Sequence, residues 1–431
     1  MIDDLTIGFV GLSHLGLNSA AATATKGCKL VCYDSDRILI QSLVENNIPT
    51  NEPDLAETIE KYRSNISFVS DHHQLEICDL IYVSMDVPTD QNNRSDLTPI
   101  RDLIQTINSF TSKTTPLIVH SQVPPGFTRS IKCSQRPIFY QVETLIFGQA
   151  LKRALEPERI VIGCSDLTYK LDDNLQRLLE SYNCPLIRMG YESAELLKIS
   201  INLYLIATLS VTNMMAELCE KLDADWDEIV PALQLDRRIG KYAYLKPGLG
   251  FSGGNLERDL ATTAMMASNL DCNSALVDSW ISDNVYRKKW VIDKLQEHDL
   301  ISDKRSTLAI LGLAYKPNTS SIKNSVAIDL LTKLIDLDRQ HKINVFDPVV
   351  TSHDIPDYNV TFMDSALQTC HDADALLLMT PWEEFQSLVP SDLANIMKGT
   401  IVIDPYRILN PVDCKKAGLN YFTLGKNCQL T

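Results

Sequence analysis

Residues 5–17 read LTIGFVGLSHLGL, a short apolar run that ends in glycine and opens into a segment of helical character. The run predicts a buried strand over residues 5–12. The glycines after it permit a tight turn and a close approach of a pyrophosphate to a helix N-terminus. A serine stands where the fingerprint GxGxxG has its second glycine. The segment therefore predicts a dinucleotide-binding turn made by Gly11, Ser13, His14, Leu15 and Gly16.

A carboxylate follows at the end of the next expected strand, CKLVCYD (28–34). Asp34 comes 23 residues after Gly11, the spacing expected for an acid that binds the ribose hydroxyls of an adenosine. Because a carboxylate repels a 2′-phosphate, the sequence favours NAD over NADP as the cofactor.

Strand-like runs alternate with helical segments twice along the chain. Such alternation predicts parallel sheets that are covered by helices on both faces. In the first half a helix is expected over 96–110, and the second half begins where the pattern resets near 301–306. The further expected strands are 79–85, 116–121, 159–163, 307–313, 342–348, 373–379 and 400–405.

The middle of the chain has a different pattern. Residues 194–222 read AELLKISINLYLIATLSVTNMMAELCEKL, with apolar positions nearly all round a helix, which is typical of burial between domains or subunits. Another helix is expected over 275–298. The predicted fold class is α/β, with two Rossmann-like parallel-sheet domains joined by a long central helix. The expected parts are an NAD-binding Rossmann-like domain (1–192), a helical connector with a glycine-rich loop (193–300) and a second Rossmann-like domain (301–431).

Composition narrows the function classes. The chain has 431 residues, 45% of them hydrophobic, and a formal net charge of −15, which argues against nucleic-acid or anionic-membrane partners. The N-terminus MIDDLTIGFVGL lacks the basic start of a signal peptide, and no apolar stretch is expected to reach the roughly 18 residues of a membrane helix. Eleven scattered cysteines without a CxxC indicate reduced thiols, a cytoplasmic location and no metal site.

Five further segments, taken with the first turn, resemble the UDP-glucose/GDP-mannose dehydrogenase family in order and almost end to end. They are SQVPPGFT (121–128), YQVETLIFGQALKRALEPERIVIG (140–163), AELLKISINLY (194–204), DRRIGKYAYLKPGLGFSGGNLERDL (236–260) and GLAYKPNTSSIKNS (312–325). The resemblance implies that the N-terminal domain binds NAD, that the C-terminal domain binds the nucleotide, and that the long helix joins a homodimer. Family members oxidise the C6 alcohol of a nucleotide-linked hexose to a carboxylate with two NAD in turn, through a thiolate that attacks the intermediate aldehyde.

The resemblance also implies roles for single residues. Glu143 acts as a general base or orders water, Lys198 and Asn202 stabilise an oxyanion at C6, and Asp259 holds the catalytic water. Gln122 joins the residues that are expected to bind NAD. The substrate group comprises Arg238, which reaches across the dimer, and Tyr244, Gly250, Lys316 and Arg407.

Several positions depart from the family pattern. Asn255 occupies the place of the nucleophilic cysteine, and an amide nitrogen cannot replace a thiolate in covalent catalysis. Gln122 replaces a threonine, and residues 320–323 read SSIK where the family has D-D-x-R. Arg407 is displaced by one place. The base and the sugar therefore stay open, with a UDP-sugar as the default.

Alternatives stand beside these roles. Glu195 and Lys198 fit a plain surface pair on a helix, and Asp259 fits an N-terminal helix cap. For the whole chain we favour an NAD-dependent oxidoreductase that transfers a hydride without the thioester step. An NAD-retaining epimerase and a non-catalytic nucleotide-sugar-binding homologue are the two other hypotheses.

Overall fold

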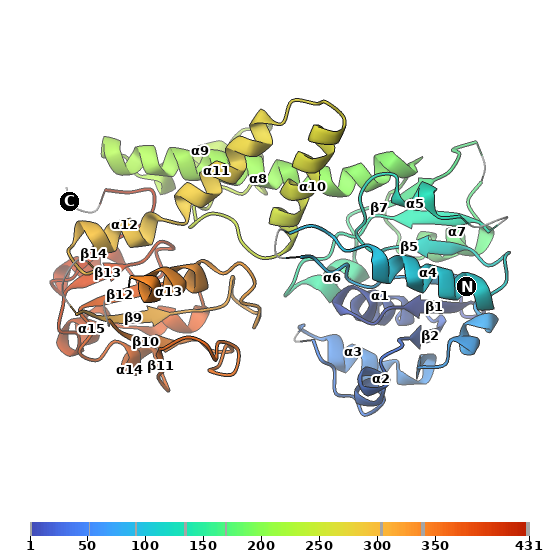
Figure 1. Cartoon of the computed structure of the whole chain (residues 1–431), viewed down its shortest axis with the longest axis horizontal. Coiled ribbons are helices and arrows are strands. Elements are labelled where there is room, and N and C mark those ends of the chain that lie inside the picture. Colours follow the sequence, from blue (N-terminus) through green and yellow to red (C-terminus); the bar gives the residue numbers. More distant parts are fainter. Residues whose placement is uncertain are drawn as a thin grey trace. The chain divides into compact units, whose positions relative to one another are not determined.

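The computed structural model describes residues 2–50, 52–90, 93–132, 136–168, 170–301, 305–337 and 341–427. The chain divides into two compact units, Met1–Ile201 and Asn202–Thr431, which we call the N-terminal and C-terminal units. Each unit is built on one parallel-dominated sheet, and the long helix α8 (Tyr191–Leu222) runs from the first unit into the second (Figure 1). The predicted fold class is confirmed. The three-part division of the chain stays a prediction.

The N-terminal unit has an eight-stranded sheet in the order β3-β2-β1-β4-β5-β6-β7-β8. Its strands are β1 (Thr6–Val10), β2 (Lys29–Tyr33), β3 (Ile66–Val69), β4 (Leu80–Val83), β5 (Leu117–Val119), β6 (Ile138–Gln141), β7 (Ile160–Cys164) and β8 (Leu186–Gly190). Neighbouring strands are parallel except β6 and β7, which are antiparallel. The segment between those two strands contains one short helix, α6 (Ala150–Leu155).

Helices cover both faces of this sheet, as the strand-helix alternation predicts. They are α1 (His14–Ala24), α2 (Arg37–Val44), α3 (Leu55–Lys61), α4 (Thr98–Phe110), α5 (Phe127–Ser130), α6 and α7 (Asp173–Glu180) (Figure 1). The core consists of two layers. Phe9, Tyr82 and Ile118 pack with the alanines of α1 on one face. Val83 and Val119 pack with α4 on the other, because successive strand residues point to opposite faces.

Helix α8 has 32 residues, and several large apolar side chains along it are exposed in the described part of the chain. It is long and apolar enough to cross a membrane by length and composition, and 39% of its most apolar window is buried. The expectation that no stretch reaches such a length was therefore wrong, although core helices of soluble proteins pass the same test. The exposed apolar side chains along it are Leu196, Tyr204, Val211, Met214, Leu218 and Leu222.

The C-terminal unit has a six-stranded sheet, parallel throughout, in the order β11-β10-β9-β12-β13-β14. Its strands are β9 (Thr307–Leu311), β10 (Lys342–Phe346), β11 (Thr361–Phe362), β12 (Ala375–Leu378), β13 (Ile401–Ile403) and β14 (Asn420–Phe422). Its helices beyond α8 are α9 (Trp226–Leu235), α10 (Asn255–Asn269), α11 (Ala275–Arg287), α12 (Trp290–Glu297), α13 (Val326–Asp336), α14 (Ala366–Thr369), α15 (Pro390–Ile396) and α16 (Pro411–Lys416).

The single helix predicted over 275–298 was wrong, because the chain breaks at Lys288 and Lys289 into α11 and α12. Contacts on either side of the break explain it. The Lys288 ammonium lies 3.0 Å from the Glu257 carboxylate, and the indole N–H of Trp290 donates to Glu220 at 3.1 Å. Burial of these two side chains outweighs continuation of one helix.

The two sheets begin with the same backbone device. Gly11 after β1 and Gly312 after β9 both have positive φ, +87° and +93°. The next backbone N–H in each turn donates to an aspartate at the end of the adjacent strand, at 2.9 Å for Asp34 and 2.7 Å for Asp347. This contact fixes the direction in which the chain leaves the first strand of each sheet.

We expect Gly312→Ala to destabilise the C-terminal unit by about 2–5 kcal/mol, because the backbone strain adds to a severe overlap. An alanine Cβ there would lie 2.5 Å from the Cβ of Thr380. Gly418→Ala is the matched control, since Gly418 also has positive φ but no atom lies within 4 Å of the added Cβ. It should lose only about 1–2 kcal/mol. Urea unfolding followed by tryptophan fluorescence measures both, because all four tryptophans lie between residues 226 and 382. Equal losses would contradict the steric argument.

Candidate functional site

The turn after β1 is shaped to receive a phosphate group. A Cβ on Gly11 would lie 2.5 Å from the Cβ of Met85, and one on Gly16 would lie 2.1 Å from the carbonyl oxygen of Gly11. Both glycines are therefore required by the backbone. The first turn of α1 has no side-chain cap, so its N–H groups and the helix dipole stay open to an anion.

Ser13, which replaces a fingerprint glycine, has its hydrogen-bond partners in the segment directly after β4. Its hydroxyl donates to the carbonyl of Ser84 at 3.3 Å and accepts from the N–H of Asp86 at 2.8 Å. The side chain is thus tied to the segment after β4. The serine strengthens the turn, and the N–H groups of α1 still face outward.

His14 is anchored by a buried acid that the sequence did not reveal. The Nε2 atom of His14 lies 2.9 Å from Glu52, and the imidazole stacks on Phe147 with ring centres 4.0 Å apart. Glu52 also accepts from the N–H groups of Gly148 and Ala150, at 3.0 and 2.6 Å. This carboxylate therefore joins the phosphate-binding turn to the loop before α6. Leu15, another predicted cofactor residue, is buried inside α1.

Asp34 lies at the carboxyl end of β2 and is partly exposed. It accepts from the N–H groups of Leu12 and Asp36, at 2.9 and 3.0 Å. Since a carboxylate has about four acceptor positions, capacity is left for the two hydroxyls of a ribose. The open N-terminus of α1 and this carboxylate fit NAD. Gln122 is partly buried in the loop after β5.

Glu143 and Lys198 form a buried ion pair. The carboxylate Oε2 lies 2.7 Å from the ammonium Nζ, and the side chains are 13% and 8% exposed. Burial raises the pKa of Glu143, but the charge and the hydrogen bond of Lys198 outweigh it and leave the pKa below its usual value. Glu143 is therefore an ionised carboxylate, held beside a cation at the edge of the sheet.

Glu195 has a different partner from the one that its position on the helix suggested. It is fully buried and accepts from the N–H groups of Gly126 and Thr128, at 2.6 and 2.8 Å. The interpretation of Glu195 and Lys198 as a surface pair was wrong. Glu195 holds the PPGFT turn in place, and Lys198 pairs with Glu143.

His120 is a further residue beside the Glu143–Lys198 pair, and the sequence analysis missed it. It follows β5 directly and is buried. Burial lowers the pKa of His120 to about 4, while Glu143 raises it and Lys198 lowers it further. The imidazole is therefore neutral at pH 7. In the sequence, His120 stands at the end of the strand predicted over 116–121. That position could have indicated a site residue, because the other polar residues also lie at the carboxyl edge of the sheet.

Three predicted site residues of the C-terminal unit lie in one contact network that includes Arg258. They are Asn202, Asn255 and Asp259. Asn202 donates to Asp259 at 2.6 Å. The Nε atom of Arg258 lies 3.5 Å from Asp259, and its Nη2 atom donates to the Oδ1 atom of Asn255 at 3.1 Å. Asp259 and Arg258 are 1% and 8% exposed. Asp259 lies inside α10, so its interpretation as an N-terminal cap was wrong.

The glycine-rich loop before Asn255 packs closely on its own unit. A Cβ on Gly250 would lie 2.3 Å from the amide oxygen of Asn284, which accepts from the N–H of Phe251 at 2.8 Å. A Cβ on Gly253 would lie 2.7 Å from the ring of Tyr315. The glycines thus admit another chain segment and set the position from which α10 starts.

The remaining predicted substrate residues are held by separate contacts. Arg238 is exposed and pairs with Asp236 at 2.6 Å, and the Tyr244 side chain is 40% exposed. The Nζ atom of Lys316 lies 5.6 Å from the ring centre of Tyr315, beside the glycine-rich loop.

Arg407 belongs to an ion network of the C-terminal unit. It has positive φ, and its guanidinium lies 2.9 Å from Asp225, which also binds Lys426 at 2.9 Å. The charge of Arg407 therefore serves the contact between the start of α9 and the segment after β13.

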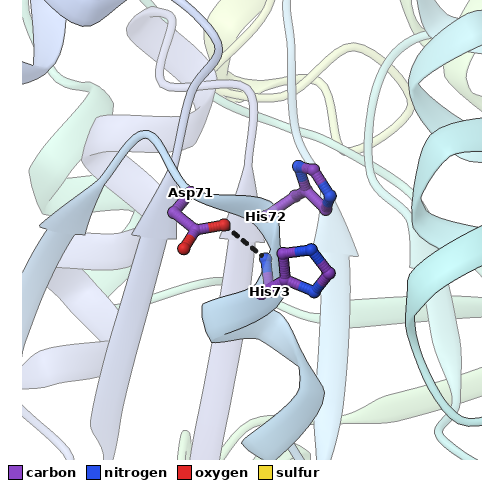
Figure 2. A group of neighbouring side chains, drawn as sticks. All are labelled: Asp71, His72 and His73. Atoms are coloured by element: carbon purple, nitrogen blue, oxygen red, sulfur yellow. Dashed lines mark hydrogen bonds between the residues drawn. The ribbon is translucent and has the colours of Figure 1, made fainter.

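One group of described residues brings possible metal ligands together. One ligand atom from each of Asp71, His72 and His73 lies within 4.8 Å of the others. Figure 2 shows that the Asp71 carboxylate binds the backbone N–H of His73, at 3.0 Å. His73 Nδ1 lies 2.8 Å from Glu76, and both imidazoles pack on Phe110. The group caps a short helical turn, and the absence of a metal site stays a prediction.

Comparison with known proteins extends over all parts of the chain. Residues 5–183 match the NAD binding domain of the UDP-glucose/GDP-mannose dehydrogenase family, 192–286 its central domain and 309–411 its UDP binding domain. UDP-glucose 6-dehydrogenase TuaD of Bacillus subtilis is 28% identical, over 97% of this chain and 93% of its own. UDP-glucose 6-dehydrogenase of Rickettsia bellii is also 28% identical, over 98% and 99%.

Solved structures support the same fold. A UDP-glucose dehydrogenase from Pyrobaculum islandicum superposes with a TM-score of 0.84 at 23% identity, covering 97% of this chain and 96% of that one. UDP-D-ManNAc dehydrogenase from Pyrococcus horikoshii gives 0.85 at 19% identity, covering 98% and 100%. With the three domain matches, these findings establish that the chain belongs to the UDP-glucose/GDP-mannose dehydrogenase family and is an oxidoreductase that uses NAD.

Proposed function

We propose that this chain oxidises a hydroxyl-bearing carbon of a nucleotide-linked hexose, a UDP-sugar by default, and that it does so without a thioester intermediate. NAD, when bound at the turn after β1, supplies the hydride acceptor. The observation that carries the proposal is the buried Glu143–Lys198 pair, with 2.7 Å between carboxylate and ammonium. Alcohol oxidation needs a base and a stabilised oxyanion, and this pair offers both.

The two members of the pair have complementary roles. Glu143 is ionised and accepts the proton of the substrate hydroxyl as a general base. The Lys198 ammonium beside it stabilises the negative charge that develops on the substrate oxygen. Low exposure strengthens both effects, because the charges are poorly screened by water.

Asn255 acts in this proposal as a hydrogen-bond donor. A guanidinium can only donate, so the contact of Arg258 with Asn255 assigns the amide oxygen to the Arg258 side. The NH₂ group of Asn255 is then directed away from Arg258 and offers two donors to a substrate oxygen. An acid product would require direct oxidation of an aldehyde hydrate, with Asp259 or Glu143 positioning water.

The proposal includes a homodimer formed through α8. Six large apolar side chains are exposed along this helix, and Tyr204 is 79% exposed. Exposed apolar surface of this kind marks an interface between subunits. The cytoplasmic location stays a prediction.

We expect Lys198→Met to lower kcat roughly 100-fold or more, because the oxyanion loses its cation and Glu143 is left buried without a counter-charge. Lys221→Met is the matched control, since it removes an exposed ammonium from the same helix. NADH absorbance with NAD and a panel of UDP-hexoses measures both. Equal activity of the two variants would contradict the role of Lys198. An altered sugar without NADH would instead favour the epimerase, and binding without turnover the non-catalytic homologue.

We expect the wild-type chain to form one NADH per sugar and Asn255→Cys to raise this ratio toward two. A thiolate at residue 255 can attack the aldehyde and allow a second oxidation. Asn255→Ser is the control, because a serine hydroxyl without a base beside it stays a poor nucleophile. Single-turnover NADH yield with limiting sugar measures the ratio. A cysteine variant that binds sugar normally and still gives one NADH would rule out this placement of residue 255.

We expect Tyr204→Glu to convert the dimer to a monomer, because a buried charge at an apolar interface has no partner. Ile38→Glu is the control, since Ile38 is 83% exposed and lies on α2, away from α8. Light scattering coupled to gel filtration gives the mass of each variant. A Tyr204→Glu variant that keeps the wild-type mass would exclude α8 as the interface.

A further inference from the structure

A small pocket, partly open to solvent, lies in the N-terminal unit beside the segment that carries Glu143. Its volume is about 50 Å³, and it is lined by α1, α6 and five strands or their ends. Its lining contains both polar and apolar side chains. The polar side chains that matter here are those of Ser19, Tyr82, His120, Gln141 and Arg153.

Two buried polar atoms on this cavity have no hydrogen-bond partner in the described protein, namely Nδ1 of His120 and Oγ of Ser19. Both residues are 7% exposed. Buried polar atoms are rarely unsatisfied, and ordered water is their usual partner when protein groups are out of reach. A cavity of about 50 Å³ has room for at least one water molecule. The space therefore fits resident water bound to His120 and Ser19.

His120 connects this cavity with the base. Strands β5 and β6 pair in parallel, with Val119 opposite Tyr140, so His120 and Glu143 both emerge at the same edge of the sheet. The negative charge of Glu143 raises the pKa of His120 and the positive charge of Lys198 lowers it, so both charges lie within electrostatic reach of the imidazole. A neutral imidazole can accept a proton on one nitrogen and release a proton from the other.

We propose that the cavity holds resident water and that His120 and this water carry away the proton that Glu143 accepts from the substrate. The step rests on the proposed role of Glu143. The substrate O–H bond breaks and a Glu143 O–H bond forms. The proton then moves to one imidazole nitrogen, the proton on the other nitrogen moves to water, and one proton reaches solvent for each hydride transferred. His120 acts through Glu143 and is a positioning residue.

The first test is crystallographic and does not depend on activity. A high-resolution crystal structure of the wild-type chain should show water about 3 Å from Nδ1 of His120. An empty cavity, or a protein group bonded to that nitrogen, would overturn the water site and the proton path with it.

The second test is kinetic. His120→Phe should lower kcat at least tenfold at pH 7 and change KM and NAD affinity less than about threefold. The kcat of this variant should also rise with pH and with buffer concentration, because the proton now leaves to solvent bases. His120→Gln keeps a hydrogen-bonding group but cannot relay a proton, so it should show the same buffer dependence.

The charged or titratable groups that face His120 are Glu143, Lys198, Tyr82, Tyr182, Arg153 and Arg159.

Tyr82→Phe is the matched control. It removes another hydroxyl from the same cavity, one that donates to Gln141 at 3.1 Å, and should leave kcat independent of buffer. A loss of kcat in both His120 variants without any buffer dependence would overturn the proton path. A wild-type chain that makes no NADH would overturn the proposed function and the path together, and the crystal alone would then decide the water site.

Discussion

The turn after the first strand of each sheet depends on one contact, between a backbone N–H group and the aspartate that ends the neighbouring strand. In the C-terminal unit Asp347 accepts from Leu313 and Ala314, and also from Val349, Val350 and the indole of Trp382, so its acceptors are used within the fold. Asp34 in the N-terminal unit has two such donors and is partly exposed. The carboxylate of Asp347 is thus fully used by donors of its own unit, whereas the carboxylate of Asp34 keeps acceptor positions that suit the hydroxyls of a ribose. It also sets the direction of α1, whose N-terminus has no side-chain cap and can bind an anion.

Three buried carboxylates organise the N-terminal unit around that turn. Glu52 binds His14 and two N–H groups, Glu143 binds Lys198, and Glu195 binds two N–H groups of the PPGFT turn. An unpaired buried charge is expensive, so each of these contacts fixes a loop relative to the sheet. Of the three, only Glu143 pairs with a lysine ammonium, and it accepts one backbone N–H bond, from Leu145 at 2.5 Å. That difference separates a group suited to accept a proton from two groups that hold structure.

The local sequence pattern was sufficient to predict the fold class but not to identify every residue of the candidate site. The strands at 5–12 and 28–34 were predictable because apolar runs end there at glycine or aspartate. Strands β6 and β8 were missed because polar residues such as Gln141 and Arg188 interrupt them. Glu143, Lys198 and Asp259 were found through family resemblance. Glu52 and His120 were missed because their partners lie far away in sequence, so that only tertiary contacts reveal them. The same holds for Arg258, whose partners at 255 and 259 are near but whose burial has no sequence signal.

The buried charges of each unit bear on the chemistry of the chain. In a homologue without activity, buried charged groups would have only a structural role. Here Arg258 is 8% exposed and still contacts both Asp259 and the oxygen of Asn255, and the Glu143–Lys198 pair is intact in the other unit. Replacing a buried ion pair with apolar residues is often neutral or stabilising, so such pairs are weak devices for stability alone. Their presence favours a chemical use. An amide whose oxygen is bound by an arginine also has a defined donor side, which suits it to bind an oxygen acceptor.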